Sequence, residues 1–228
     1  PAGDLDVRKG ELTTAQWKEV LDQIAEAGCL FLLISGGEPL LRPDFAELFI
    51  YARKKGMLVT LFTNGTLLTP EIVDVLAEWG LHAMEISLYG ATPETYQKVT
   101  GQPGSFERCL RGIDLALSRG IKLDLKTVLL TLNQAELEQM KAITNRYGLG
   151  FRYDNTLWPR LDGGEQPYDQ RLSLEEMLAA PEIQCVNVLT PNAYHYDAVI
   201  AAAQAGRNVL VEKPPAMSLR ETDSMIAT

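Results

Sequence analysis

The stretch at residues 30–41, LFLLISGGEPLL, constrains the fold more than any other part of the chain. An apolar run from Leu30 to Ile34 leads into a turn that contains Gly36, Gly37, Glu38 and Pro39. A continuous apolar run bounded by glycines and a proline predicts a parallel β-strand that is buried on both faces. The paired glycines let the backbone approach a ligand closely, because no Cβ stands in the way. Glu38 then falls where α/β proteins keep their binding groups, although a tight turn with a solvated glutamate is the simpler alternative.

Apolar strand-like runs alternate with amphipathic stretches along the first two thirds of the chain. Strands are expected at 30–34, 58–62, 83–88, 122–130 and 151–154, with helices opening near Thr14, Asp44, Pro70, Pro93, Ser105 and Asn133. Asn133 and Glu136 have the spacing of a helix-capping pair. This alternation predicts α/β architecture with right-handed βα repeats and a parallel sheet. Periodicity alone leaves open whether the sheet curls into a barrel.

Composition excludes several classes of partner. The net charge of −9 argues against nucleic acid and against an anionic membrane surface. No segment approaches the roughly 20 apolar residues of a membrane span, and no signal-peptide pattern opens the chain. Cys29, Cys109 and Cys185 lie far apart, which fits neither a disulfide framework nor a metal site. We therefore predict a cytoplasmic protein whose cysteines are buried for packing.

The composition changes from Trp158 onward. Residues 161–171 are rich in Gly, Pro, Asp and Gln, and this pattern predicts a loop or linker. A helix at 173–180, a strand at 185–189, a helix at 194–205, a strand at 208–211 and a last helix opening at Ser218 are then expected. Periodicity alone would allow these elements to continue the same sheet.

Several stretches between about residues 10 and 176 resemble the radical S-adenosylmethionine (radical SAM) enzymes, above all those that modify peptides or mature other enzymes. The supporting stretches are GELTTAQW, LLISGGEPLLRPDF, LVTLFTNGTLLT, MEISLYGATPETYQKVTGQPGSFER and LDLKTVLLTLN. The resemblance implies a partial (β/α) barrel that binds S-adenosylmethionine (SAM) at the carboxyl ends of its strands. The implied SAM-binding residues are Gly36, Gly37, Glu38, Pro39, Thr63, Asn64, Ser87 and Lys126.

The chemistry of these residues suits SAM. The GGE turn would hold the amino end, since a carboxylate and backbone carbonyls suit an ammonium. The strand-end residues Thr63, Asn64 and Ser87 would face the ribose and carboxylate, together with Lys126. For Lys126 an equal alternative is a strand-end lysine that pairs with Asp124 or with solvent.

One departure from the radical SAM pattern concerns the iron–sulfur cluster. The family binds a 4Fe-4S cluster through three closely spaced cysteines on its first barrel strand, because such clusters need thiolate ligands. The chain contains no such triplet, and Cys29, Cys109 and Cys185 lie in sequence that does not match it. We expect the chain to begin just after the triplet, and we predict no metal ligands within it.

A second resemblance covers about residues 173–228. The stretch CVNVLTPNAYHYDAVIAAAQAGRNVLVEKPPAMSLRE is similar to the nicotinamide-dependent oxidoreductases typified by glucose-fructose oxidoreductase and inositol dehydrogenase. The resemblance places these residues beside the nicotinamide, with Lys213 taking part in catalysis: Thr190, Pro191, Asn192, His195, Glu212, Lys213 and Pro214. The alternatives are an ordinary helix-start turn at TPN and a surface lysine. The Gly-rich GxGxxG turn that cradles the pyrophosphate in that family does not occur.

These observations predict two domains, a partial radical SAM (β/α) barrel at 1–172 and a βαβ Rossmann-like fragment at 173–228, joined as a chimera. Three functions follow. The first is a radical SAM-type enzyme fragment that acts on a small molecule or peptide and is inactive alone without cluster cysteines. The second is a fragment of an NAD(P)-dependent oxidoreductase. The third is an α/β scaffold without activity.

Overall fold

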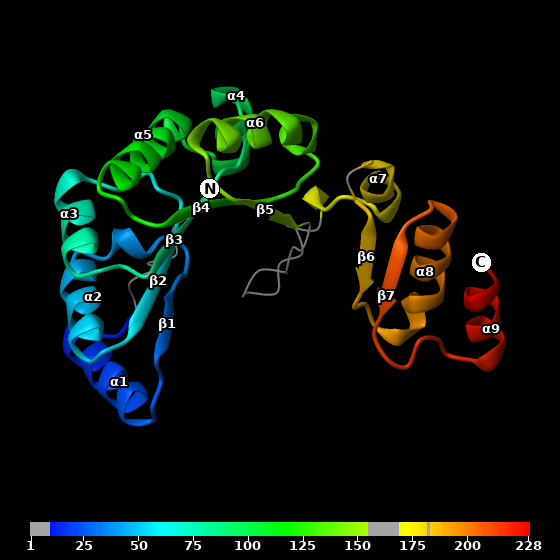
Figure 1. Ribbon diagram of the computed structural model, residues 1–228, viewed down its shortest axis with the longest axis horizontal. Helices are drawn as coiled ribbons and strands as arrows, with labels where there is room; N and C mark the ends of the chain where they lie inside the picture. The colour runs from blue at the N-terminus through cyan, green and yellow to red at the C-terminus, as the bar shows by residue number, and fades with distance from the viewer. Residues whose placement is uncertain (1–9, 155–168, 182) are drawn as a thin grey trace. The chain divides into compact units, whose positions relative to one another are not determined.

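The computed structural model describes residues 10–154, 169–181 and 183–228. The chain divides into two compact units, one within residues 1–156 and the other within residues 157–228 (Figure 1). Most of the predicted linker, and the change of composition at Trp158, lie outside the described residues.

The first unit is built on a five-stranded parallel sheet in the order β1-β2-β3-β4-β5. The strands are β1 (Phe31–Ile34), β2 (Leu58–Thr63), β3 (Ala83–Ser87), β4 (Leu123–Val128) and β5 (Phe151–Asp154). Helix α1 (Thr14–Glu26) precedes β1, and the helices between the strands are η1 (Pro39–Leu41), α2 (Phe45–Lys54), α3 (Pro70–Glu78), α4 (Pro93–Thr100), α5 (Ser105–Ser118), η2 (Gln134–Glu136) and α6 (Leu137–Tyr147). The predicted α/β class and parallel βα order are confirmed.

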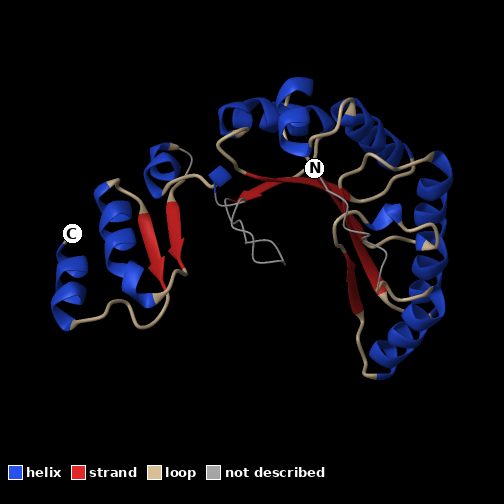
Figure 2. Ribbon diagram, turned by 180° about the vertical axis from the view of Figure 1, so that it is seen from behind, coloured by secondary structure: helices blue, strands red, loops and turns tan. Residues whose placement is uncertain are grey.

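The sheet is curved, and the helices of this unit lie along its convex side (Figure 2). Successive residues of a strand point to opposite faces, so burial alternates along β2 and β3. Val59, Leu61 and Ile86 are fully buried under the helices and form the core. Phe62 and Ser87 alternate with these core positions and point to the inner face. Because all five strands run parallel, their carboxyl ends share one edge of the sheet.

Strand β1 is less buried than its sequence predicts. The expectation of burial on both faces is wrong, since Phe31 is 65% exposed and Leu33 is 52% exposed. The reason is position: β1 lies at an edge of the described sheet, and helices cover only one of its faces. Leu32 and Ile34, on the covered face, are half-buried.

The predicted capping pair at the start of α6 is also wrong. Asn133 and Glu136 make no capping hydrogen bond, and α6 starts after a short 3-10 turn. Both side chains instead bond to groups on the β3–α4 connection, which lies more than forty residues earlier in the chain. Spacing along the sequence reveals a local partner but not a distant one that competes for the same side chain.

The cysteines are only partly as predicted. Cys109 is buried in the core, whereas Cys29 and Cys185 are exposed, so the expectation of burial was wrong for these two. Cys29 precedes the edge strand β1 and Cys185 begins a strand that has one uncovered face, which explains the exposure of both.

The second unit contains a separate two-stranded parallel sheet of β6 (Cys185–Val188) and β7 (Asn208–Val211). Its helices are α7 (Leu174–Ala179), η4 (Asn192–Tyr194), α8 (His195–Gln204) and α9 (Leu219–Ala227). The predicted βαβ order is present, and the strands do not continue the larger sheet. Its core lies between α7, β6 and α8, and consists of Leu178, Val186, Val188, Val199 and Ala202. In the described parts of both units, no helix has the length and apolar character needed to cross a membrane.

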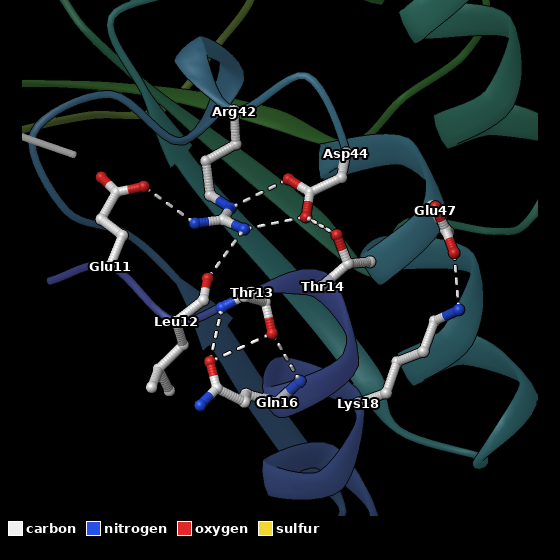
Figure 3. Close-up of polar contacts among 9 residues, drawn as sticks. All are labelled: Glu11, Leu12, Thr13, Thr14, Gln16, Lys18, Arg42, Asp44 and Glu47. Atoms are coloured by element: carbon white, nitrogen blue, oxygen red, sulfur yellow. Dashed lines mark hydrogen bonds and ion pairs between the residues drawn. The ribbon is translucent and has the colours of Figure 1, made fainter. Parts of the chain in front are cut away.

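A charged cluster around Arg42 fastens the start of α1 to the connection between η1 and α2 (Figure 3). The Arg42 guanidinium donates to both carboxylate oxygens of Asp44 at 3.0 and 2.8 Å, and Nη1 donates to Glu11 at 3.0 Å. Arg42 also donates to the Leu12 carbonyl, and the Thr14 hydroxyl donates to Asp44 at 2.7 Å. This network holds in place the segment that leads from the GGEP turn into α2.

This network predicts a measurable dependence of stability on pH. The hydrogen bond from Arg42 lowers the pKa of Asp44 below its ordinary value, so the unfolded chain takes up this proton before the folded chain does. The stabilisation is therefore complete above the ordinary aspartate pKa of about 3.9, and it is lost as the pH falls through the lower folded value. We expect Asp44→Asn and Arg42→Met to lack this part of the acid destabilisation when urea unfolding is measured from pH 6 down. If the free energy of unfolding fell equally with pH in the wild type and in both variants, the role given to the Arg42–Asp44 pair would be contradicted.

Candidate functional site

A cleft of about 590 Å³ opens at the carboxyl ends of β1 to β4. Its walls come from the strand ends, from the GGEP turn after β1, from the turn after β2, and from α4 and the start of α5. The lining residues are Ser35, Gly36, Gly37, Phe62, Thr63, Asn64, Thr66, Ser87, Tyr89, Tyr96, Val99, Thr100, Gln102, Ser105, Arg108, Lys126 and Val128. The cleft therefore combines hydroxyl and amide groups with an aromatic and aliphatic wall and two cations.

The structure brings together most of the residues that the sequence predicts for SAM. Six of the eight line this cleft: Gly36, Gly37, Thr63, Asn64, Ser87 and Lys126. They gather because each follows or ends a parallel strand, and the carboxyl ends of these strands lie at one edge. Glu38 and Pro39 are not lining residues. Pro39 is buried at the start of η1.

Glu38 joins the two turns that form this edge of the cleft. Its Oε1 accepts hydrogen bonds from the Thr63 hydroxyl at 2.7 Å and from the Leu40 backbone N–H at 3.1 Å. Its Oε2 accepts from the Asn64 backbone N–H at 2.7 Å. The carboxylate is thus bonded to the protein on both oxygens, and it fixes the GGEP turn against the turn after β2.

The Thr63-Asn64-Gly65 turn is held by its own hydrogen bonds and by close packing against α5. Thr63 is buried and its hydroxyl oxygen accepts from the Gly65 N–H at 3.1 Å, while Asn64 Oδ1 accepts from both the N–H and the hydroxyl of Thr66. Gly65 has a φ of +74°, which a residue with a Cβ rarely adopts. Helix α5 contacts this turn through Gly112, whose missing side chain leaves room for the Gly65 carbonyl.

Lys126 lies on the inner face of the sheet, beside the cleft. Its ammonium is 3.5 Å from the Glu85 carboxylate and 3.2 Å from the centre of the Phe62 ring. Burial lowers the pKa of Lys126, and the attraction of Glu85 only partly offsets this. The alternative pairing with Asp124 is wrong, because Glu85 on the neighbouring strand is the acidic partner and Asp124 accepts from the Gly150 N–H.

Tyr96 and Cys109 pack beneath Ser87 and contact its backbone carbonyl. The Tyr96 hydroxyl donates to the Ser87 carbonyl at 3.0 Å, and the Cys109 thiol lies 3.8 Å from the same oxygen. Burial raises the pKa of Tyr96, and it raises the pKa of Cys109 to about 11. Both groups therefore remain protonated at neutral pH, and their role is to pack against the backbone at Ser87 rather than to react.

Sequence reasoning missed the far wall of the cleft. This wall comes from the β3–α4 loop, the last residue of α4, the α4–α5 connection and the first turns of α5, and its residues are Tyr89, Thr100, Gln102, Ser105 and Arg108. The polar run around Gln102 reads as an ordinary loop, and its position over the strand ends follows from the packing of α4 and α5. These residues belong to the stretch MEISLYGATPETYQKVTGQPGSFER, which supports the family resemblance, but no local pattern within it assigns them to a site.

The described residues do not fit a 4Fe-4S cluster. All three cysteines are described, and they lie before β1, on α5 and on β6 of the second unit. Within residues 10–154, 169–181 and 183–228, no three metal-ligating side chains gather in one place. Cys109, whose thiol lies 3.8 Å from the Ser87 carbonyl oxygen, is buried and protonated.

The second unit places its predicted residues on two adjacent loops. Thr190, Pro191 and Asn192 follow β6, and Glu212, Lys213 and Pro214 follow β7. His195, which is fully buried, links the loops: Nε2 lies 2.6 Å from the Thr190 carbonyl oxygen and Nδ1 lies 3.0 Å from that of Pro214. The Lys213 side chain is 92% exposed.

The fold and the cleft together define an α/β protein with a cleft at the carboxyl ends of a curved parallel sheet. A model of the radical SAM superfamily matches residues 3–142, which is more than half of the chain. The chain therefore belongs to the radical SAM superfamily. A model of an oxidoreductase family with an NAD-binding Rossmann fold matches residues 126–228.

Three relatives with assigned activities each match more than half of the chain. An AdoMet-dependent heme synthase of Methanosarcina barkeri is 39% identical over 147 residues, which are 64% of this chain and 42% of that protein. The mycofactocin maturase MftC of Mycobacterium tuberculosis is 35% identical over 144 residues, 63% of this chain and 37% of that protein. The PqqA peptide cyclase of Ruegeria pomeroyi is 38% identical over 129 residues, 57% of this chain and 34% of that protein. The chain spans less than half the length of each of the three.

Solved structures share the fold. Streptococcus suis SuiB superposes with a TM-score of 0.63 at 18% identity, over 89% of this chain and 44% of that one. The structure of anSMEcpe with bound AdoMet gives 0.62 at 16% identity, over 89% of this chain and 56% of that one. Both show that the α/β fold with a parallel sheet is shared with these structures.

Proposed function

We propose that the first unit is the SAM-binding part of a radical SAM-type enzyme and that the cleft holds SAM. The observation that carries this proposal is the gathering, in one cleft, of six of the eight residues that the radical SAM resemblance implies for SAM. Membership of that superfamily agrees with it.

The chemistry of the walls supports an assignment of the parts of SAM. The backbone of Gly36 and Gly37 is open to a ligand, since a Cβ built at either glycine meets nothing within 4 Å. Its carbonyl groups suit an ammonium. Arg108 and Lys126 are the cations of the cleft and suit a carboxylate, while Asn64, Ser87 and Thr63 offer partners for ribose hydroxyls.

The relatives support a substrate that is a peptide or a small molecule. A maturase and a peptide cyclase are among them, as is a heme synthase. We propose no nucleic-acid or membrane partner, because the net charge of −9 opposes both.

Titration calorimetry with SAM tests the proposal. Binding is expected to be weak, because a few hydrogen bonds of about 1 kcal/mol each hold the ligand. Gly37→Ala should weaken binding further and leave the fold intact, since the added methyl meets no atom within 4 Å and φ is not positive. Glu138→Ala, an exposed change on α6, should bind as the wild type does. Equal binding by Gly37→Ala, or no binding by the wild type, would contradict the proposal.

A second prediction is that this chain alone does not cleave SAM reductively. Three thiolates are needed to hold the cluster, and the cysteines of the described residues do not converge. After anaerobic incubation with iron and sulfide, we expect no stoichiometric 4Fe-4S absorbance and no 5′-deoxyadenosine on adding dithionite. Catalytic formation of 5′-deoxyadenosine would show that the ligand argument is wrong.

The second unit carries an alternative function as a fragment of an NAD(P)-dependent oxidoreductase. The match of residues 126–228 to that family and the link through His195 between the two loops favour it. We propose that residues 173–228 form this fragment and that the chain joins two ancestries, as a chimera. We place Thr190, Pro191, Asn192, His195, Glu212, Lys213 and Pro214 beside the nicotinamide.

The affinity of this fragment for NAD(P) is expected to be low. The sequence has no GxGxxG turn, and the pyrophosphate normally contributes much of the binding through such a turn. We therefore expect a dissociation constant of about a millimolar or weaker, which corresponds to about 4 kcal/mol. Micromolar binding in titration calorimetry would overturn this expectation.

A further inference from the structure

The connection between β4 and α6 reaches across to the β3–α4 loop through two side chains, Asn133 and Glu136. Neither residue lines the cleft. The loop that they contact carries Tyr89 and leads directly into α4, and together these form much of the far wall.

Glu136 gathers four donors on one carboxylate. Oε2 accepts from the backbone N–H groups of Ala91 at 2.7 Å and Thr92 at 3.2 Å. Oε1 accepts from the hydroxyls of Thr92 at 2.7 Å and Thr95 at 2.6 Å. Burial raises the pKa of Glu136, but these hydrogen bonds outweigh it and leave the pKa below its ordinary value. The ionised form, which accepts on both oxygens, is the one that fits all four donors.

Asn133 holds the adjacent part of the same loop. Its side chain is fully buried, and Nδ2 donates to the carbonyls of Tyr89 and Val128, both at 3.1 Å. Its Oδ1 accepts from the Leu130 N–H at 2.8 Å. The two side chains thus fix the loop at successive points, Asn133 at Tyr89 and Glu136 at Ala91 and Thr92.

Tyr89 in turn contacts Tyr96, and Tyr96 contacts the backbone at Ser87. The Tyr89 ring packs edge-on against Tyr96 with centroids 5.8 Å apart, and the Tyr96 hydroxyl bonds to the Ser87 carbonyl. A shift of the loop would therefore move both aromatic rings and the backbone at Ser87.

We infer that Glu136 is a positioning residue for ligand binding in the cleft: it sets the place of the Tyr89 and Tyr96 wall without touching the ligand. Asn133 assists it from the same connection. This inference rests on the proposed function for its ligand, SAM, but the placement of the wall does not depend on that ligand.

The test compares Glu136→Ala with Glu138→Ala in the full chain. Glu138 lies two residues further along, in the first turn of α6, and its side chain is 70% exposed with an ion pair to Lys141. Glu138→Ala therefore removes one negative charge, as Glu136→Ala does, but removes no hydrogen bond to the β3–α4 loop. Glu136→Gln is the conservative variant, which keeps one acceptor oxygen and should rescue part of the effect.

Two readouts are measured well below the unfolding temperature. Hydrogen exchange of the ligand-free chain should accelerate about tenfold or more at amides 89–96 in Glu136→Ala, while α2 and α3 keep wild-type protection. The SAM dissociation constant of Glu136→Ala should be about tenfold higher than that of the wild type, which corresponds to about 1.4 kcal/mol. The dissociation constant of Glu136→Gln should lie between those of the wild type and Glu136→Ala. Glu138→Ala should change neither quantity.

The outcomes separate this inference from the proposed function. Unchanged exchange at 89–96, exchange that rises equally throughout the unit, or unchanged SAM affinity beside a loosened loop would each overturn the inference. Where the wild-type chain binds no SAM, the proposed function fails, and the exchange of the free chain alone decides whether Glu136 positions the wall.

Discussion

Gly112→Ala is expected to destabilise the first unit and to disturb the cleft, although alanine is the better helix former. In the middle of α5, alanine is favoured over glycine by about 1 kcal/mol. A Cβ at this position would lie 2.2 Å from the Gly65 carbonyl oxygen and 3.3 Å from the Leu68 side chain. Overpacking of this kind costs about 1–3 kcal/mol, and a backbone oxygen at this distance puts the cost at the upper end. The overlap therefore outweighs the gain in helix propensity.

The expected net loss is about 2 kcal/mol in the free energy of unfolding. Urea unfolding followed by circular dichroism measures it, with Gly37→Ala as the matched addition of one methyl group in open space. Because Gly65 belongs to the turn that carries Asn64, the same variant should bind SAM more weakly. A stability within about 0.5 kcal/mol of the wild type would show that α5 does not pack on this turn as described.

Glu38→Ala is expected to have the largest effect on the cleft edge. It removes the acceptor for three hydrogen bonds and separates the GGEP turn from the turn after β2. Hydrogen bonds to a charged group contribute about 1.5–3 kcal/mol, and the Thr63 hydroxyl that is left behind is buried. We expect a loss of about 2–3 kcal/mol in stability together with a loss of SAM binding of more than tenfold.

The two effects of Glu38 distinguish two roles. A residue that contacts only the ligand would change affinity and leave stability at its wild-type value. A residue that holds the two turns together changes both. Thermal unfolding without ligand, beside calorimetry with SAM, makes the comparison, and an unchanged melting temperature would contradict the bridging role assigned here.

The near wall of the cleft was predictable because it depends on local rules. Gly36, Asn64 and Ser87 each follow or end an apolar run, and parallel strands bring their carboxyl ends to one edge. The far wall was not predictable in this way. Tyr89 and Arg108 lie in connections whose position depends on how α4 and α5 pack, and that packing leaves no periodic signal in the sequence.

The errors have the same origin. Asn133 and Glu136 have the spacing of a local cap, yet donors and acceptors on the β3–α4 connection hold them instead. Phe31 and Leu33 belong to an apolar run that reads as buried, but burial depends on which neighbours cover a strand. In each case the sequence indicates whether a side chain is polar or apolar, but tertiary structure decides which neighbours it contacts.

The central claim is that the cleft between the GGEP turn and α4 binds SAM. The most direct measurement is a titration of the ¹⁵N-labelled chain with SAM, followed by two-dimensional NMR. The account predicts saturable shifts that centre on the amides of Gly36, Gly37, Asn64 and Ser87, with smaller shifts at Tyr89 and Thr100. Shifts confined to residues 185–228, or none at these amides at millimolar SAM, would contradict it.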